Sequence, residues 1–183
     1  MIELRFHGRG GQGAVTSAEL LALSAIAQGQ YAQAFPSFGP ERRGAPVVAF
    51  ARISPDQIRN RTAVQKPNVV IVLDPSILRI VNTSDGLAAD GVQIVNSSLP
   101  AAELRSAYKL GGKKLVVVNA NQIAAQEIGR VITNTTMLGA LIRATALVDK
   151  DALVSEIKER FGRIAERNIR AFNRAYDECV IVE

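Results

Sequence analysis

Strands and helices alternate in the hydrophobic pattern of the chain. Apolar and polar residues alternate over residues 2–7, which is typical of a strand with one buried face. After a glycine-rich stretch, apolar residues recur at helical spacing over residues 18–26, and Gly29 stands where this helix would end. A second strand, over residues 31–35, is expected to complete a first βαβ unit.

Four later segments are also rich in aliphatic and β-branched residues. The run over residues 69–73 is too apolar to be half exposed, and it predicts a central strand covered on both faces. Ser54-Pro55-Asp56-Gln57 combines a capping residue with proline at the first helical position, and it predicts a short helix. The further strands are expected over residues 47–53, 92–95 and 114–118.

The second half of the chain is mostly helical in its pattern. Cys179 to Val182 form an apolar tail, which either adds an edge strand or docks against another subunit. Strands alternating with helices predict a mostly parallel, possibly mixed, sheet with helices on its faces. We therefore expect one Rossmann-like three-layer α/β domain over residues 1–183. The helices are expected over residues 101–110, 123–128, from Asn134 onward, 151–161 and 164–176.

Composition narrows the possible functions. The net charge is +5, from 22 basic and 17 acidic residues, but the basic residues of the C-terminal helices alternate with acids and form no continuous tract. With nine aromatic residues, three Tyr and six Phe, nucleic-acid binding is disfavoured. No apolar run is long enough to span a membrane and no signal peptide is evident, so we expect a cytoplasmic protein. The single cysteine, Cys179, cannot hold an iron–sulfur cluster or a zinc ion alone.

The strongest candidate for chemistry is the glycine loop, defined as residues 8–13, Gly8-Arg9-Gly10-Gly11-Gln12-Gly13. It lies between a predicted strand and a predicted helix, where backbone N–H groups and the helix dipole favour an anion. The loop fits the dinucleotide fingerprint, but no acidic residue for a ribose follows about 20 positions later. Ala14 and Val15 replace the Lys and Ser/Thr that a P-loop needs. A tight turn with glycines needed only for packing is the plain alternative.

Several segments in order resemble a known family. They are Arg5 to Thr16, Tyr31 to Pro36, Phe38 to Pro46, Arg52 to Ser54, Asn134 to Ala140 and Asn168 to Phe172. Together they resemble the gamma subunits of 2-oxoacid:ferredoxin oxidoreductases, in particular the pyruvate type, pyruvate synthase. The resemblance covers nearly the whole chain.

The resemblance implies a role in a reversible reaction that converts a 2-oxo acid and coenzyme A to acyl-CoA and CO₂ with reduction of ferredoxin. It also implies that thiamine diphosphate, Mg and 4Fe-4S clusters are bound by the alpha, beta and delta subunits, the partners of this chain. Ferredoxin would then interact only indirectly. This chain has no catalytic residue in that scheme and would contribute a coenzyme A contact and subunit interfaces.

The candidate residues for coenzyme A follow from the same resemblance. Backbone amides of the glycine loop would bind the pyrophosphate, with Arg9 as a further contact or a surface charge. Arg42 and Arg43 either bind a phosphate or belong to an interface. Thr16 and Thr135 could offer hydroxyl groups. The full set is Gly8, Arg9, Gly10, Gly11, Gln12, Gly13, Thr16, Arg42, Arg43, Asn134 and Thr135.

Other polar residues near these segments have structural explanations. Helix capping accounts for Asn134 without a ligand. His7, the only histidine, has no acidic partner in the sequence, so a structural hydrogen bond is favoured over acid–base work. Asn119 and Asn121 follow a predicted strand, where either a ligand or a turn explains them. A purely architectural subunit and a free-standing dinucleotide-binding reductase remain the alternative functions.

Overall fold

A mixed β-sheet forms the centre of the computed structural model, which describes residues 1–37 and 43–183. Within these residues seven strands have the order β2-β3-β1-β4-β5-β6-β7. Strands β1, β4, β5 and β6 are parallel, whereas β3 pairs antiparallel with β1 and β2, and β7 pairs antiparallel with β6. The bounds are β1 Ile2–Arg9, β2 Tyr31–Pro36, β3 Pro46–Ser54, β4 Val69–Val72, β5 Val92–Asn96, β6 Lys114–Val118 and β7 Val180–Val182.

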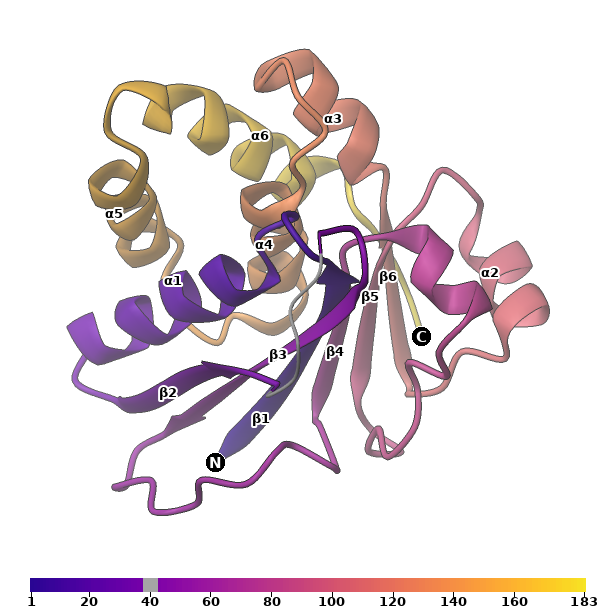
Figure 1. The fold of residues 1–183 in the computed structure, drawn as a ribbon, viewed down its shortest axis with the longest axis horizontal. Helices are drawn as coiled ribbons and strands as arrows, with labels where there is room; N and C mark the ends of the chain where they lie inside the picture. The colour runs from indigo at the N-terminus through magenta and orange to yellow at the C-terminus, as the bar shows by residue number, and fades with distance from the viewer. Residues whose placement is uncertain (38–42) are drawn as a thin grey trace.

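Helices lie on both faces of this sheet (Figure 1). The larger layer contains α1 (Ala14–Ala27), α3 (Ala120–Glu127), α4 (Asn134–Thr145), α5 (Lys150–Phe161) and α6 (Ala165–Glu178), with the short η2 (Gly162–Ile164) between the last two. The opposite face carries α2 (Ala101–Tyr108) and the 3₁₀ helix η1 (Pro75–Arg79). The expected three-layer α/β domain with a mixed sheet is confirmed.

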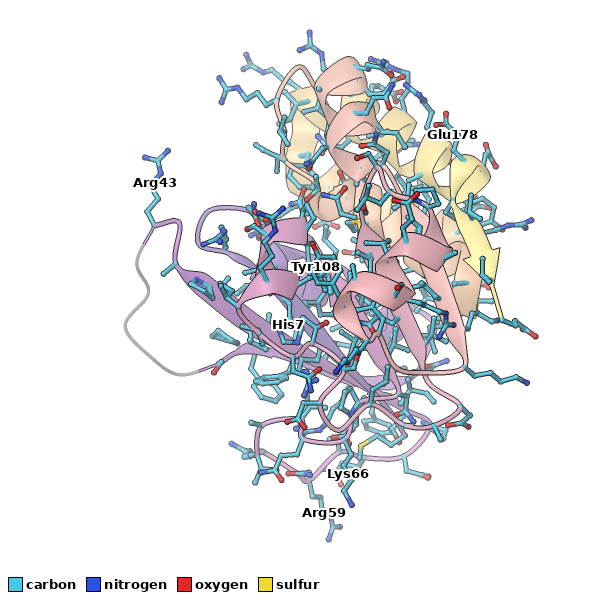
Figure 2. All side chains as sticks on the ribbon, turned by 90° about the vertical axis from the view of Figure 1, so that its right-hand side faces the viewer. His7, Arg43, Arg59, Lys66, Tyr108 and Glu178 are labelled. Carbon is cyan, nitrogen blue, oxygen red and sulfur yellow. The ribbon has the colours of Figure 1, made fainter. Side chains whose placement is uncertain are left out.

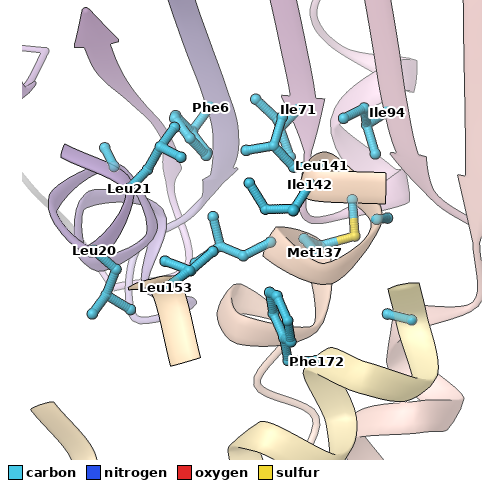
Figure 3. Close-up of a cluster of buried hydrophobic side chains, with 14 of the residues drawn as sticks. Phe6, Leu20, Leu21, Ile71, Ile94, Met137, Leu141, Ile142, Leu153 and Phe172 are labelled. Carbon is cyan, nitrogen blue, oxygen red and sulfur yellow. The ribbon is translucent and has the colours of Figure 1, made fainter. Parts of the chain in front are cut away.

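Alternation along β1 assigns its side chains to the two layers. Leu4 and Phe6 are buried in the larger core, and Figure 3 shows Phe6 on the side of the sheet that faces Leu21 of α1 and Leu141 of α4. Arg5 and His7 are also buried, but they lie on the η1 and α2 side, where the smaller core includes Val70 and Leu104. Both faces of the central strands are therefore covered, as the apolar run over 69–73 predicts.

The helix α4 is the central helix of the larger layer and packs closely against α6. A Cβ atom added at Gly139 would overlap the carbonyl oxygen of Phe172 and would lie 3.0 Å from the carbonyl carbon of Phe172 and 3.1 Å from the backbone nitrogen of Tyr176. Glycine at this position thus allows the two helix backbones to approach each other.

One predicted helix is absent, because Ser54 is the last residue of β3 and no helix follows it. Its hydroxyl accepts a hydrogen bond from the Asp56 N–H at 3.2 Å, which makes a local turn. The segment after the turn is held by the buried Arg52, whose guanidinium donates to the carbonyls of Asn60 and Thr62. These tertiary hydrogen bonds override the local capping pattern.

The remaining elements agree with the sequence pattern within a few residues. The tail adds the edge strand β7, one of its two predicted roles. The predicted crossover from β1 through α1 to β2 is present, but β3 lies between the two parallel strands. The basic C-terminal helices are salt-bridged: Glu127 of α3 pairs with both Arg170 and Arg174, and Arg174 also pairs with Glu178 of its own helix.

Candidate functional site

The glycine loop lies where the strand order reverses. From β1 the chain crosses to β2 and β3 on one side of the sheet, and from β4 it continues to β5 and β6 on the other. The loop is at the carboxyl end of β1, beside the carboxyl end of β4, where Leu73 donates its N–H to the His7 carbonyl at 2.8 Å. Open α/β sheets bind ligands at such a switch point.

Two glycines of the loop have left-handed backbone conformations that favour glycine. Gly11 has φ 92°, and a Cβ atom there would meet nothing within 4 Å. Gly13 has φ 80° and is the N-cap of α1, and a Cβ atom there would lie 2.6 Å from Nδ2 of Asn134. Gly11 is therefore needed only for the left-handed backbone conformation, whereas Gly13 also leaves space for the Asn134 side chain from α4.

The loop leaves several N–H groups at the start of α1 without an acceptor. Gly10 donates to the Ala45 carbonyl at 2.9 Å and Gln12 to the Arg9 carbonyl at 3.0 Å, so these two amides are already used. Within the described residues, the amides of Gly11, Gly13 and Ala14 have no partner, and no side chain caps α1. An uncapped helix N-terminus carries partial positive charge and suits an anion.

The side chain of Asn134 adds a second donor beside Gly13. This residue is 4% exposed, and its Oδ1 atom accepts the Thr135 N–H at 2.9 Å. In the described part of the chain, Nδ2 of Asn134 makes no hydrogen bond, and it faces the position of the missing Gly13 side chain. This amide donor is therefore available to a ligand acceptor beside Gly13.

The Arg9 guanidinium, by contrast, is engaged within the chain. Its Nε and one terminal nitrogen donate to the Ser76 hydroxyl at 2.9 and 2.8 Å, and the other terminal nitrogen donates to the Gly44 carbonyl at 2.8 Å. Asp74 lies 3.7 Å from Nε. Burial tends to raise the pKa of Asp74, but hydrogen bonds from Ser76 and Gln12 and the charge of Arg9 hold it below its usual value. The carboxylate thus stays ionised and neutralises Arg9.

Backbone pairing brings the predicted arginine segment beside the loop. Gly10 forms a β-bridge with Arg43, and Gly44 donates its N–H to the Gly10 carbonyl at 3.2 Å. The Arg43 side chain is exposed and points away from the domain (Figure 2). Arg42 lies outside the described residues.

The other predicted site residues have different surroundings. Thr16 is half-buried in the first turn of α1. The Thr135 hydroxyl is fully buried and donates to Asn168 of α6 at 2.9 Å, so it serves helix packing. Asn119 caps α3, and Asn121 accepts a hydrogen bond from Asn96 at 2.8 Å. For these two residues the structural explanation suffices.

His7 lies inside the domain, as Figure 2 also shows, and is 4% exposed. Its Nε2 atom accepts a hydrogen bond from Nε of Arg5 at 3.0 Å. Burial and the neighbouring charge of Arg5 lower the pKa of His7 to about 4, so the imidazole is neutral near pH 7. The hydrogen bond from Arg5 and the burial of His7 support the structural role that the sequence favours.

A cavity of about 320 Å³ lies beside η1 at the carboxyl ends of β5 and β6. Ser76, Arg79, Asn96, Tyr108 and Asn121 are among its lining residues, and Ser76 also accepts hydrogen bonds from Arg9 of the glycine loop. Its position and mixed polar and apolar lining suit part of an extended ligand.

The described residues also bear on metal binding and on membrane crossing. Within residues 1–37 and 43–183, no group of three His, Cys, Asp or Glu side chains is arranged to hold a metal ion. No helix in this part of the chain is long and apolar enough to cross a membrane.

Sequence reasoning missed two residues of this site, Asp74 and Ser76. Asp74 follows β4, caps η1 and bonds Gln12 of the glycine loop. The available signal was Asp74-Pro75-Ser76 itself, a capping residue followed by proline at the first helical position. The partner in the glycine loop could not be read from that pattern.

The fold is a Rossmann-like domain whose glycine loop lies at the topological switch point, where its geometry suits an anion. A more specific assignment comes from comparison, since residues 3–178 match the family model described as pyruvate ferredoxin/flavodoxin oxidoreductase. The chain belongs to this family, and within it to the gamma subunits.

Named relatives support both statements. The "Pyruvate/ketoisovalerate oxidoreductases common subunit gamma" of Pyrococcus abyssi is 48% identical over 184 residues, which cover 100% of both chains. The "Pyruvate synthase subunit PorC" of Methanothermobacter thermautotrophicus is 48% identical over 97% of this chain and 96% of its own. The crystal structure of pyruvate oxidoreductase subunit PORC from Thermotoga maritima superposes with a TM-score of 0.89 at 40% identity, covering 100% and 98% of the two chains. The chain is therefore one subunit of an oxidoreductase that needs other subunits.

Proposed function

We propose that this chain supplies a coenzyme A contact to a pyruvate:ferredoxin oxidoreductase. The complex converts pyruvate and coenzyme A to acetyl-CoA and CO₂ and reduces ferredoxin, and the reaction is reversible. Thiamine diphosphate, Mg and the 4Fe-4S clusters belong to the alpha, beta and delta subunits. One cysteine in the whole sequence is too few to ligate such a cluster from this chain alone.

The observation that carries the proposal is the group of donors around Gly13. The amides of Gly11, Gly13 and Ala14, which have no partner within the described residues, and the Nδ2 atom of Asn134 lie where α1 begins. Phosphate oxygens accept such hydrogen bonds and are stabilised by the helix dipole. Coenzyme A has a pyrophosphate that can accept hydrogen bonds from these donors, and the cavity lined by Ser76 offers space for part of the rest of the molecule.

Asn134→Asp in the assembled complex tests this contact. The substituted carboxylate keeps an oxygen acceptor for the Thr135 N–H, but it removes the Nδ2 donor and places negative charge beside a bound phosphate. We expect the KM for coenzyme A to rise about tenfold or more, the effect of losing one charged hydrogen bond. The KM for pyruvate should stay within twofold of the parent value, a limit set by the ~0.4 kcal/mol that twofold represents.

Two controls make the test specific. Asn68→Asp changes another asparagine whose side-chain oxygen accepts a backbone N–H, that of Glu3 at 2.9 Å, at the opposite end of the strands from the glycine loop. It should leave the KM for coenzyme A unchanged. With pantetheine as acceptor, which has no phosphate, the difference between the parent complex and Asn134→Asp should vanish. If Asn134→Asp assembles normally and binds coenzyme A like the parent, the chain is an architectural subunit instead.

A further inference from the structure

A short side-chain hydrogen bond joins the glycine loop to Asp74, the N-cap residue of η1. The Gln12 side chain donates from Nε2 to Oδ2 of Asp74 at 2.6 Å, across 62 positions of sequence. Its Oε1 atom accepts the N–H of Arg9 at 2.8 Å, so the same amide group also closes the loop on itself. Gln12 therefore uses both ends of its side chain to set the loop conformation.

The Asp74 carboxylate is fixed on its other side. Its Oδ1 atom accepts the Ser76 N–H at 2.8 Å and the Ser76 hydroxyl at 2.6 Å. Ser76 in turn accepts two N–H bonds from Arg9. Because Pro75 begins η1 directly after Asp74 and has a fixed φ, the carboxylate is held at a defined position.

This network decides which amides of the loop face outward. In the conformation that joins Gln12 to Asp74, the Gln12 N–H donates to the Arg9 carbonyl and Gly11 and Gly13 are left-handed. Within the described residues, the N–H groups of these two glycines have no partner. Asp74 offers a ligand only acceptor atoms, and the Gln12 amide already uses its oxygen and one of its two N–H groups within the chain. The main contribution of this pair to binding is therefore geometric.

We propose that Asp74 and Gln12 are positioning residues, which hold the glycine loop in the shape that presents its amides to the phosphate of coenzyme A. The inference rests on the proposed coenzyme A contact. It assigns Gln12 to loop geometry through its side chain and adds Asp74, a residue of the neighbouring strand end, to the determinants of binding.

A reciprocal exchange of the two side chains tests the proposal in the assembled complex. In Asp74→Asn, Ser76 holds the remaining side-chain oxygen, so the new NH2 group faces the NH2 group of Gln12 and the hydrogen bond is lost. In Gln12→Glu, two carboxylates face each other and repel. The double variant, Asn at 74 with Glu at 12, restores one donor and one acceptor with the direction reversed and the total charge unchanged. A role of Asp74 limited to capping η1 would not be rescued from position 12, so the cycle isolates the pair.

Two readouts are needed. Hydrogen–deuterium exchange over residues 8–16 reports the order of the loop, and the KM for coenzyme A reports its consequence. We expect each single variant to speed exchange in this segment and to raise the KM about tenfold, as for one charged hydrogen bond. The double variant should return both values to within about threefold of the parent, a residual of ~0.65 kcal/mol. Asp56→Asn, an exposed acid at the opposite edge of the sheet, is the control for lost charge and should change neither.

Failure of this inference is distinguishable from failure of the proposed function. If Asn134→Asp raises the KM for coenzyme A but Asp74→Asn does not, or if the double variant is no better than the singles, Asp74 and Gln12 do not position the loop for binding. If neither Asn134→Asp nor Asp74→Asn changes that KM, the coenzyme A contact itself is refuted, and the positioning role falls with it.

Discussion

Gly139 of α4 permits a sharp stability prediction, because a single methyl group at this position has no space. The Cβ atom of Gly139→Ala would overlap the Phe172 carbonyl oxygen and would lie 3.1 Å from the Tyr176 backbone nitrogen. These are backbone atoms of α6, so no side-chain rotation can relieve the contact. The helices α4 and α6 must separate, in the most buried part of the larger core.

Two opposing effects set the magnitude. Alanine is more favourable than glycine in a helix by about 1 kcal/mol. Overpacking a well-packed core costs typically about 1–3 kcal/mol, and contact with backbone puts this site at the upper end. The net loss for Gly139→Ala is therefore about 2 kcal/mol, which for a chain of this size lowers Tm by about 4–8 °C. Gly139→Ser should be worse, because its hydroxyl adds volume and a buried polar group.

Gly129 is the matched control, measured by urea and thermal unfolding of the same chain. It has φ 80° and no atom within 4 Å of an added Cβ, so substitution there costs only the left-handed conformation, about 1–2 kcal/mol. Alanine and serine should cost the same at position 129 and differ at position 139. The close approach of α4 and α6 is wrong if Gly139→Ala leaves the free energy of unfolding unchanged or raises it. It is also wrong if the loss of stability from alanine to serine is the same at positions 129 and 139.

Two further predictions concern the buried polar groups of β1 and β3. Burial and the charge of Arg5 lower the pKa of His7 to about 4, so the unfolded chain takes up a proton near pH 6.5 that the folded chain refuses. The contribution of His7 to the free energy of unfolding should therefore be constant above pH 6.5 and fall by on the order of 3 kcal/mol between pH 6.5 and 4. Urea midpoints that fall equally in the parent and in His7→Gln over this range would refute this. Arg52 is fully buried and bonds Glu3 at 2.7 Å, so Arg52→Met should cost about 3–5 kcal/mol, and a measured loss below about 1 kcal/mol would contradict the assigned contacts.

The sequence predicted most elements because their burial is periodic. The apolar run over 69–73 and the stripes of the C-terminal helices are local signals, and tertiary packing reinforces them. Ser54-Pro55 and Asp74-Pro75 show the limit of such signals. Both pairs combine a capping residue with proline, a pattern typical of a helix start. Only Asp74 begins a helical turn, because the segment after Ser54 gives its carbonyls to Arg52. A buried guanidinium from a strand cannot be seen in the local pattern.

In the candidate site, too, local features could be predicted from the sequence and tertiary contacts could not. The place of the glycine loop between a strand and a helix could be predicted, and so could the nearness of the segment that ends at Arg43. The connection of Gln12 with Asp74 could not, since it depends on two strands lying side by side in the sheet. For the same reason the sequence did not reveal that Thr135 turns toward α6 and not toward the loop.

The charges around the loop explain why its shape matters more than its composition. Arg9 is the one cation within the loop, and Asp74 at 3.7 Å neutralises it. What remains for an anion is a set of dipoles: the first amides of α1 and the Asn134 side-chain amide. Dipole interactions decline faster with distance and misalignment than the interaction of two charges, so displacement of the loop by a fraction of an ångström weakens every contact at once. A side-chain network that fixes the loop, such as the one from Gln12 to Asp74, is therefore worth more here than an additional exposed arginine such as Arg43.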